Sequence, residues 1–420
     1  MRIVSSFIAL GVMLAAPDAN AQTLQETLRL TLINNPAIAA AEIELELAEE
    51  TLLVARAARS IEISTGVTTQ LQSVSSNRLF GALAGETFIS QASIEASIPI
   101  FTAGEIAATI SQARYSLEAA EYALAAQKQE TLLSAINAHL GVQFAAEQVA
   151  IREQNLIRLE RQLNAARDRF EAGVVTRTDT ALAEARWRGA EAQLAGAQAE
   201  LEGARARYLQ ITGESATQPA LEGLPVGMPV SIDEGIDRLL EENPNLQRYV
   251  ALEFMAGEAI RIAESRQRPR VELFGSASIQ DGRWDNEFRD ESAILGARAS
   301  MPLYTGGRLQ SAVRQAGMDR AQLRLRRDDA RNQLIAMFAE AWAQHRAATS
   351  SAIAAREEVR ANEVALEGAE IEVSVGLRTT LDLLDQEQEL LEAQLRLIDA
   401  EKNVYLSASQ ILALLGALGA

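Results

Sequence analysis

The alternation of apolar and polar residues follows two different periods along this chain. In four short stretches apolar residues occupy every second position, as Ile61, Ile63, Val67 and Leu71 do in the first. Elsewhere apolar residues recur every three or four positions over long distances. A period of two predicts half-buried strands, and a period near 3.6 predicts amphipathic helices. We therefore expect a mainly α-helical protein with four strands. These strands are expected at residues 61–73, 88–100, 271–280 and 293–303.

The longest helical patterns, Glu105–Ala172 and Arg308–Val375, contain no proline. At ~1.5 Å per residue, roughly 68 residues span about 100 Å. Each pattern stops at a glycine, and a shorter helical pattern follows it. On the last of these patterns apolar residues fall every seven positions from Leu384 to Leu412, which is typical of supercoiled helices. Helices of this length need partners along their surface, so coiled-coil-like hairpins are expected.

The two halves of the chain repeat each other at a fixed distance. The turn Gly173–Thr176 recurs 203 residues later as Gly376–Thr379. In both copies an aspartate follows the threonine by three residues, which predicts a capping box at the start of a helix. Proline and glycine are frequent between the halves. The sequence therefore predicts a first repeat at residues 22–211, a linker at 212–229 and a second repeat at 230–420.

The faces of the predicted strands allow two interpretations. Each strand has one apolar and one polar face, which suits a membrane barrel as well as a half-buried sheet of a soluble protein. Four strands cannot close a barrel, because the smallest membrane barrels have about 8. If the strands cross a membrane, several copies of the chain must contribute to one wall.

The first 21 residues have the features of a secretion signal. Arg2 is followed by an apolar run, and Ala19-Asn20-Ala21 offers small residues for cleavage. We therefore expect residues 1–21 to be removed and the mature protein to be exported.

Composition excludes several classes of function. The net charge of −18 makes nucleic acid an unfavourable partner. The chain has no cysteine, which removes disulfides and thiolate metal sites. It lacks the Gly-x-x-x-x-Gly-Lys phosphate loop and any cluster with the context of a catalytic site. We expect no enzymatic activity, no cofactor and no bound metal.

Two further motifs repeat: an Asn-Pro pair that stops a helix, at Pro36 and Pro244, and a Pro-x-x-x-x-Gly corner at the end of each strand pair, at Pro99 and Pro302. Together with the secretion signal, the duplicated halves and the two Val-Gly turns, these motifs resemble the TolC family of outer-membrane efflux and secretion channels. The resemblance covers essentially the whole mature chain. It implies a homotrimer in the outer membrane in which three protomers form one 12-stranded β-barrel. The barrel would continue into a long α-helical tunnel across the periplasm. It also implies two protein partners, a periplasmic adaptor and an inner-membrane exporter of the ABC or proton-driven type, and contact with outer-membrane lipid.

The same resemblance assigns roles to residues at the two turns. Asp382 and Asp385 match the acidic constriction of the tunnel, where crowding of carboxylates in a trimer would raise some of their pKa values. Arg378 matches an arginine that closes the entrance by pairing with an acid of the first repeat, here Asp179. Val373 replaces a tyrosine of that closing network. The residues that match the adaptor-docking tips are Gly173, Val174, Gly376 and Leu377.

Simpler interpretations stand beside these roles. Asp382 also fits an acid that stabilises the first turn of a helix, and Arg378 fits a solvated side chain. For the whole chain, the alternative is a soluble periplasmic coiled-coil adaptor or scaffold whose strands form an ordinary sheet.

Overall fold

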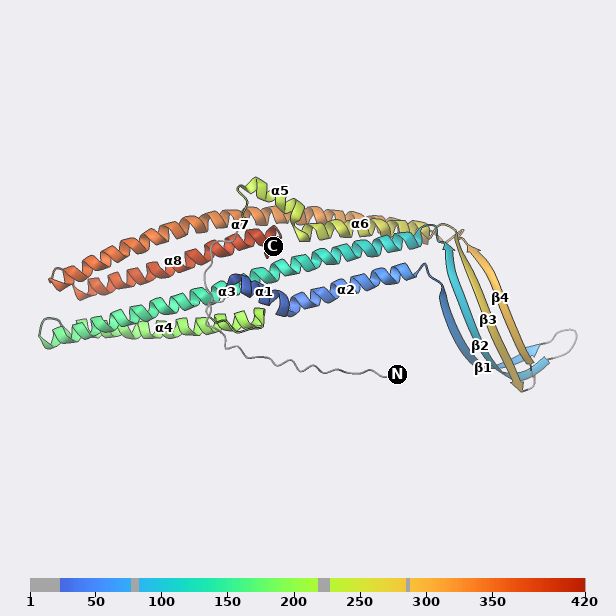
Figure 1. The fold of residues 1–420 in the computed structure, drawn as a ribbon, viewed down its shortest axis with the longest axis horizontal. Helices are drawn as coiled ribbons and strands as arrows, with labels where there is room; N and C mark the ends of the chain where they lie inside the picture. The colour runs from blue at the N-terminus through green and yellow to red at the C-terminus, as the bar shows by residue number, and fades with distance from the viewer. Residues whose placement is uncertain (1–22, 77–82, 218–226, 285–287, 420) are drawn as a thin grey trace, which may run out of the picture. The chain divides into compact units, whose positions relative to one another are not determined.

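The computed structural model describes residues 23–76, 83–217, 227–284 and 288–419 (Figure 1). The predicted secretion signal at 1–21 and half of the predicted linker lie outside these residues. Over the described ranges the chain forms eight helices and four strands. The helices are α1 (Leu24–Asn34), α2 (Pro36–Ala57), α3 (Glu105–Glu171), α4 (Arg177–Thr212), α5 (Ile232–Glu242), α6 (Pro244–Ser265), α7 (Arg308–Ser374) and α8 (Thr380–Leu414). The strands are β1 (Glu62–Ser76), β2 (Leu83–Phe101), β3 (Arg270–Trp284) and β4 (Phe288–Ser300).

The same order of elements occurs twice: two helices, two strands, and a long hairpin of two helices. The predicted duplication is therefore confirmed. Both repeats start their second helix at a proline that follows an asparagine, Pro36 in α2 and Pro244 in α6. Proline suits this position because its missing N–H has no intrahelical acceptor in the first turn.

The strand boundaries differ from the predicted ones. β4 ends at Ser300, which pairs with Arg270, whereas the prediction continued to residue 303. Pro302 lies in that stretch and has no N–H to donate to a neighbouring strand. The other strands run further than predicted, as β3 does in reaching Trp284. Backbone pairing continues there through Asp281, Gly282 and Arg283, which show no apolar alternation.

The chain divides into two compact units, and each contains parts of both repeats. The first, which we call the hairpin unit, comprises the described residues within 23–39, 127–237 and 336–419. The second, the sheet unit, comprises those within 40–126 and 238–335.

In the hairpin unit α3 packs with α4, and α7 packs with α8 (Figure 1). Of the apolar residues predicted at seven-residue spacing on α8, Leu384, Leu391, Ile398 and Leu412 are each no more than 2% exposed, and Tyr405 is partly buried. Ile398 and Leu412 pack against apolar residues of α3 such as Phe144. These contacts join the second repeat to the first along the length of α8.

In the sheet unit the four strands are antiparallel and lie in the order β1-β2-β3-β4, so β1 and β4 are the edges (Figure 1). The helices follow the same order. α2 packs on α3 through Leu52 and Ala55, and α3 meets α6 where Tyr115 stacks on Phe254 at 5.4 Å. α6 holds α7 through an ion pair from Glu253 to Arg327. One side of α2 and one side of α7 therefore have no helix of this unit against them.

The two faces of the sheet differ in polarity. On one face, apolar residues such as Val67, Ile279 and Leu295 are exposed, Val67 by 79% and Leu295 by 89%. On the other face Arg298 forms a 3.1 Å ion pair with Glu272. A soluble half-buried sheet covers its apolar face, and this one is uncovered in the single chain. None of the described helices is both long enough and apolar enough to cross a membrane.

Candidate functional site: the tips of the two hairpins

Each hairpin of the hairpin unit turns at a glycine in a left-handed conformation. Gly173 has φ +74° and Gly376 has φ +81°. The N–H after each glycine reaches back five residues to a helical carbonyl, at 2.9 Å for Val174 and 2.8 Å for Leu377. This is the Schellman motif, which ends a helix sharply. It leaves Val174 and Leu377 73% and 78% exposed, so each tip presents an apolar side chain.

A capping box then starts the second helix of each hairpin. In the second repeat the Thr379 hydroxyl accepts the Asp382 N–H at 3.2 Å, and the Asp382 carboxylate accepts the Thr379 N–H at 3.0 Å. Thr176 and Asp179 form the same pair of bonds in the first repeat. Bonds from the Thr379 hydroxyl and N–H hold the pKa of Asp382 below its ordinary value. Within one copy the cap therefore acts on Asp382 in the opposite direction to the crowding expected in a trimer.

Arg378 and Asp179 have separate partners in the described chain. Arg378 Nε pairs with Glu372 Oε2 at 2.8 Å, across the turn of its own repeat. Asp179 is engaged by Thr176, whose N–H and hydroxyl lower the pKa of the carboxyl. The latch between Arg378 and Asp179 thus stays a prediction, and a single copy does not form it.

An ion pair between the repeats occurs at a different place. Arg186 Nη2 on α4 lies 2.9 Å from Asp385 Oδ1 on α8. Both side chains are more than a third exposed, so solvent screens the pair. The family resemblance pointed to Asp385 but not to Arg186, because the two residues are 199 positions apart and no local sequence pattern links them. In this pair the arginine comes from the first repeat and the aspartate from the second, which is the reverse of the predicted latch.

Apolar contacts near this ion pair join the two hairpins and also stabilise the second hairpin itself. Leu384 of α8 is buried among residues of α3 and α4, including Leu159 and Ala183. Val373 of α7 is buried against Leu383 and Leu390 of α8. The valine therefore contributes to the apolar core of its hairpin, where a tyrosine would bring a hydroxyl. Among the described residues no group of three or more His, Cys, Asp or Glu side chains is arranged to hold a metal.

Two long segments of the chain, residues 27–214 and 235–417, match the family described as "Outer membrane efflux protein". Together they include both repeats and both tips. The chain belongs to the outer membrane efflux protein family. This membership confirms the resemblance to TolC-type channels and places the protein in the outer membrane as an efflux or secretion channel. It does not favour the alternative of a soluble periplasmic scaffold.

Individual members of the family support the same assignment. The outer membrane efflux protein BepC of Brucella suis is 30% identical over 72% of this chain and 68% of its own length. The outer membrane protein TolC of Escherichia coli is 24% identical over 69% of this chain, but the match spans only 62% of TolC. Among solved structures, the CmeC outer membrane channel of Campylobacter jejuni has a TM-score of 0.81 at 15% identity, over 94% of this chain and 85% of CmeC. The expected fold class is therefore confirmed, and the family is one of transport proteins.

Proposed function

We propose that three copies of this chain form one passive export channel, with the pooled strands in the outer membrane and the helical hairpins in the periplasm. The observation that carries the proposal is the exposed apolar face of a sheet with only four strands. Lipid can cover that face, and strands from other copies can complete the wall. Three copies supply 12 strands if β4 of each copy pairs with β1 of the next.

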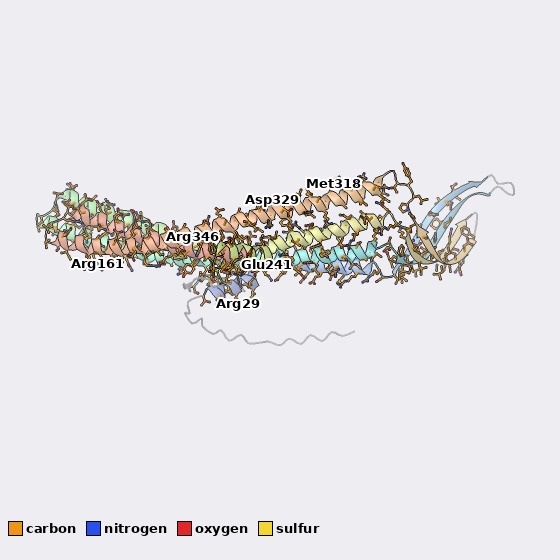
Figure 2. All side chains as sticks on the ribbon, turned by 90° about the horizontal axis from the view of Figure 1, so that it is seen from above. Arg29, Arg161, Glu241, Met318, Asp329 and Arg346 are labelled. Atoms are coloured by element: carbon orange, nitrogen blue, oxygen red, sulfur yellow. The ribbon has the colours of Figure 1, made fainter. Side chains whose placement is uncertain are left out.

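The free sides of α2 and α7 support this order of copies, because α2 leads into β1 and α7 follows β4. On α2, Ile43 and Leu47 are exposed along one stripe. On α7, Met318, labelled in Figure 2, is exposed, and Leu325 is exposed two turns further along the same stripe. Leu47 lies ten residues before the end of α2, and Met318 lies ten residues after the start of α7. The two stripes therefore reach similar distances from the sheet when neighbouring copies meet.

Charge along these two helices is complementary. α2 contains five glutamates and one arginine, and residues 308–331 of α7 contain seven arginines and three aspartates. Glu46 and Glu50 flank the apolar stripe of α2, and Arg314 and Arg326 flank that of α7. Opposite charges beside an apolar seam set the partner and the register of packed helices. We infer that α2 of one copy packs against α7 of the next.

At the tips, three copies would bring together Asp382 and Asp385 in a ring of six carboxylates. Such a ring produces a negative potential at the entrance and favours the passage of cations. Arg378 and Asp179 of adjacent copies would pair across the closed entrance after Arg378 releases Glu372. The exposed Val174 and Leu377, beside Gly173 and Gly376, offer an apolar docking surface to a periplasmic adaptor. Through this adaptor an inner-membrane ABC or proton-driven exporter supplies the energy.

Conductance across a planar bilayer tests this function. The purified mature protein should form ion channels, and replacing Asp382 and Asp385 with asparagine should lower the preference for K⁺ over Cl⁻ several-fold. Glu389→Gln, an exposed acid further along α8, serves as the control and should leave the preference unchanged. Absence of conductance would overturn the channel, and unchanged selectivity in the double variant would move the constriction away from these aspartates.

A further inference from the structure

Glu387 is a buried carboxyl group that none of the roles above uses. It lies on α8, where the second hairpin packs against α3 and α4 of the first, and it is 1% exposed. Neither of its carboxylate oxygens has a hydrogen-bond partner. A charged carboxylate in such a place is costly, because burial removes its water and no hydrogen bond of good geometry replaces it.

The surroundings of Glu387 are polar and roomy. A cavity of about 130 Å³ lies beside it, lined by Asn155, Arg186, Gly189 and Gln193 among others. Asn155 is 4% exposed, and its Oδ1 accepts no hydrogen bond. A protonated carboxyl has an O–H to donate, so it can satisfy this acceptor directly or through a water molecule in the cavity.

Charged groups of α3 and α7 act on Glu387, and a charged group of α4 lines the same cavity. Arg158 of α3 favours its charged form, and Nε and Nη2 of this arginine are themselves buried without a hydrogen-bond partner. Glu370 of α7 favours the neutral form. Arg186 of α4 lines the same cavity but is engaged by Asp385. Gln162 of α3 lies nearby and favours the charged form without completing a hydrogen bond of good geometry.

We propose that Glu387 is a proton-binding site at the junction of the two hairpins: its carboxyl group holds a proton while α8 packs against α3 and α4, and releases it to water when the hairpins separate. Loss of solvent on burial outweighs Arg158 and raises the pKa of Glu387 from 4.5 to about 7. The packing of the junction should therefore respond to pH near neutrality, and the ligand that binds is a proton.

The direction of the response follows from proton linkage. The packed junction, with the higher pKa, binds more protons than the separated one between about pH 4.5 and 7. Its packing is therefore strongest below pH 4.5, weakens as pH rises through 7 and then levels off. Each pKa unit is about a factor of ten, so the equilibrium for separation should rise on the order of 100-fold across this range. The consequence for the entrance, that higher pH favours its opening, rests on the proposed function.

Distances between spin labels test the site without requiring conductance. The chain has no cysteine, so labels on Ala181→Cys of α4 and Leu381→Cys of α8 are unique. Trimers diluted with unlabelled copies should show a longer α4–α8 distance as pH rises from 5 to 8. Glu387→Gln, which cannot ionise, should keep the short distance at every pH.

Glu184→Gln is the matched control, because Glu184 lies 203 residues before Glu387 and is exposed. It should leave the pH response unchanged. An equal response in Glu387→Gln, or no response in the unsubstituted chain, would overturn the proton site. Channel recordings separate this outcome from failure of the proposed function. If only the proton site is wrong, the channel still conducts, and Glu387→Gln has the same pH profile as the unsubstituted chain. If the proposed function is wrong, there is no conductance at any pH.

Discussion

The two hairpin tips have the same local construction and different surroundings. Both end a helix with a left-handed glycine and begin the next with a Thr-x-x-Asp capping box. The equivalent glutamates that follow behave differently. The Glu184 side chain is 52% exposed and lies 4.0 Å from Arg167, whereas Glu387 is buried and its carboxylate oxygens have no hydrogen-bond partner. The duplicated sequence therefore sets the turn in each repeat, while packing of α8 on the first hairpin sets the chemistry of the second tip.

Of the substitutions that test this contrast between the two tips, Leu384→Ala should have the largest effect. Leu384 is 2% exposed and packs between α3 and α4, so its truncation should destabilise the junction by ~2–5 kcal/mol. Hydrogen exchange of α8 amides measures the cost as faster local opening. Leu381→Ala, at a 44% exposed position of the same helix, should change little. Similar exchange in both variants would show that Leu384 does not hold the hairpins together.

Substitutions at the turn glycines should affect both tips equally. Gly173→Ala and Gly376→Ala should each cost about 1–2 kcal/mol, because φ is positive at both positions. Gly368→Ala, in the last two turns of α7 where an added Cβ meets open space, should instead stabilise its helix by about 0.5–1 kcal/mol. Helicity of the hairpins on heating, followed by circular dichroism, reports the sign of each change. A cost at only one of the two turns would break their equivalence.

Arg186→Gln should have the smallest effect. It removes the ion pair to Asp385, which is solvent-exposed and worth under ~1 kcal/mol. The destabilisation caused by this substitution should be smaller still at high salt, because dissolved ions screen an exposed ion pair. Exchange rates of α8 amides at low and high ionic strength provide the measurement. A large effect that salt does not reduce would mean that Arg186 acts through Glu387 and the cavity instead.

Local signals in the sequence predicted the helices well. Gly173, Gly376 and the threonines that follow them marked the hairpin turns, because glycine and capping residues act over a few positions. The strand ends were less accurate, since backbone pairing in β3 continues past the last alternating residue. Arg186, Asn155 and Glu387 were missed as site residues. Their role depends on which helices pack together across about half of the chain, and neither periodicity nor spacing carries that information.

The most direct test of the account concerns the seam between copies. Leu47→Cys and Met318→Cys, introduced together into the cysteine-free chain, should cross-link α2 of one copy to α7 of the next under oxidation or with a short bismaleimide. Denaturing gels should then show covalent dimers and trimers, while each single variant and the pair Leu47→Cys with Arg331→Cys should stay largely monomeric. A double variant that cross-links only within one chain, or not at all, would contradict a channel built from three copies joined in this order.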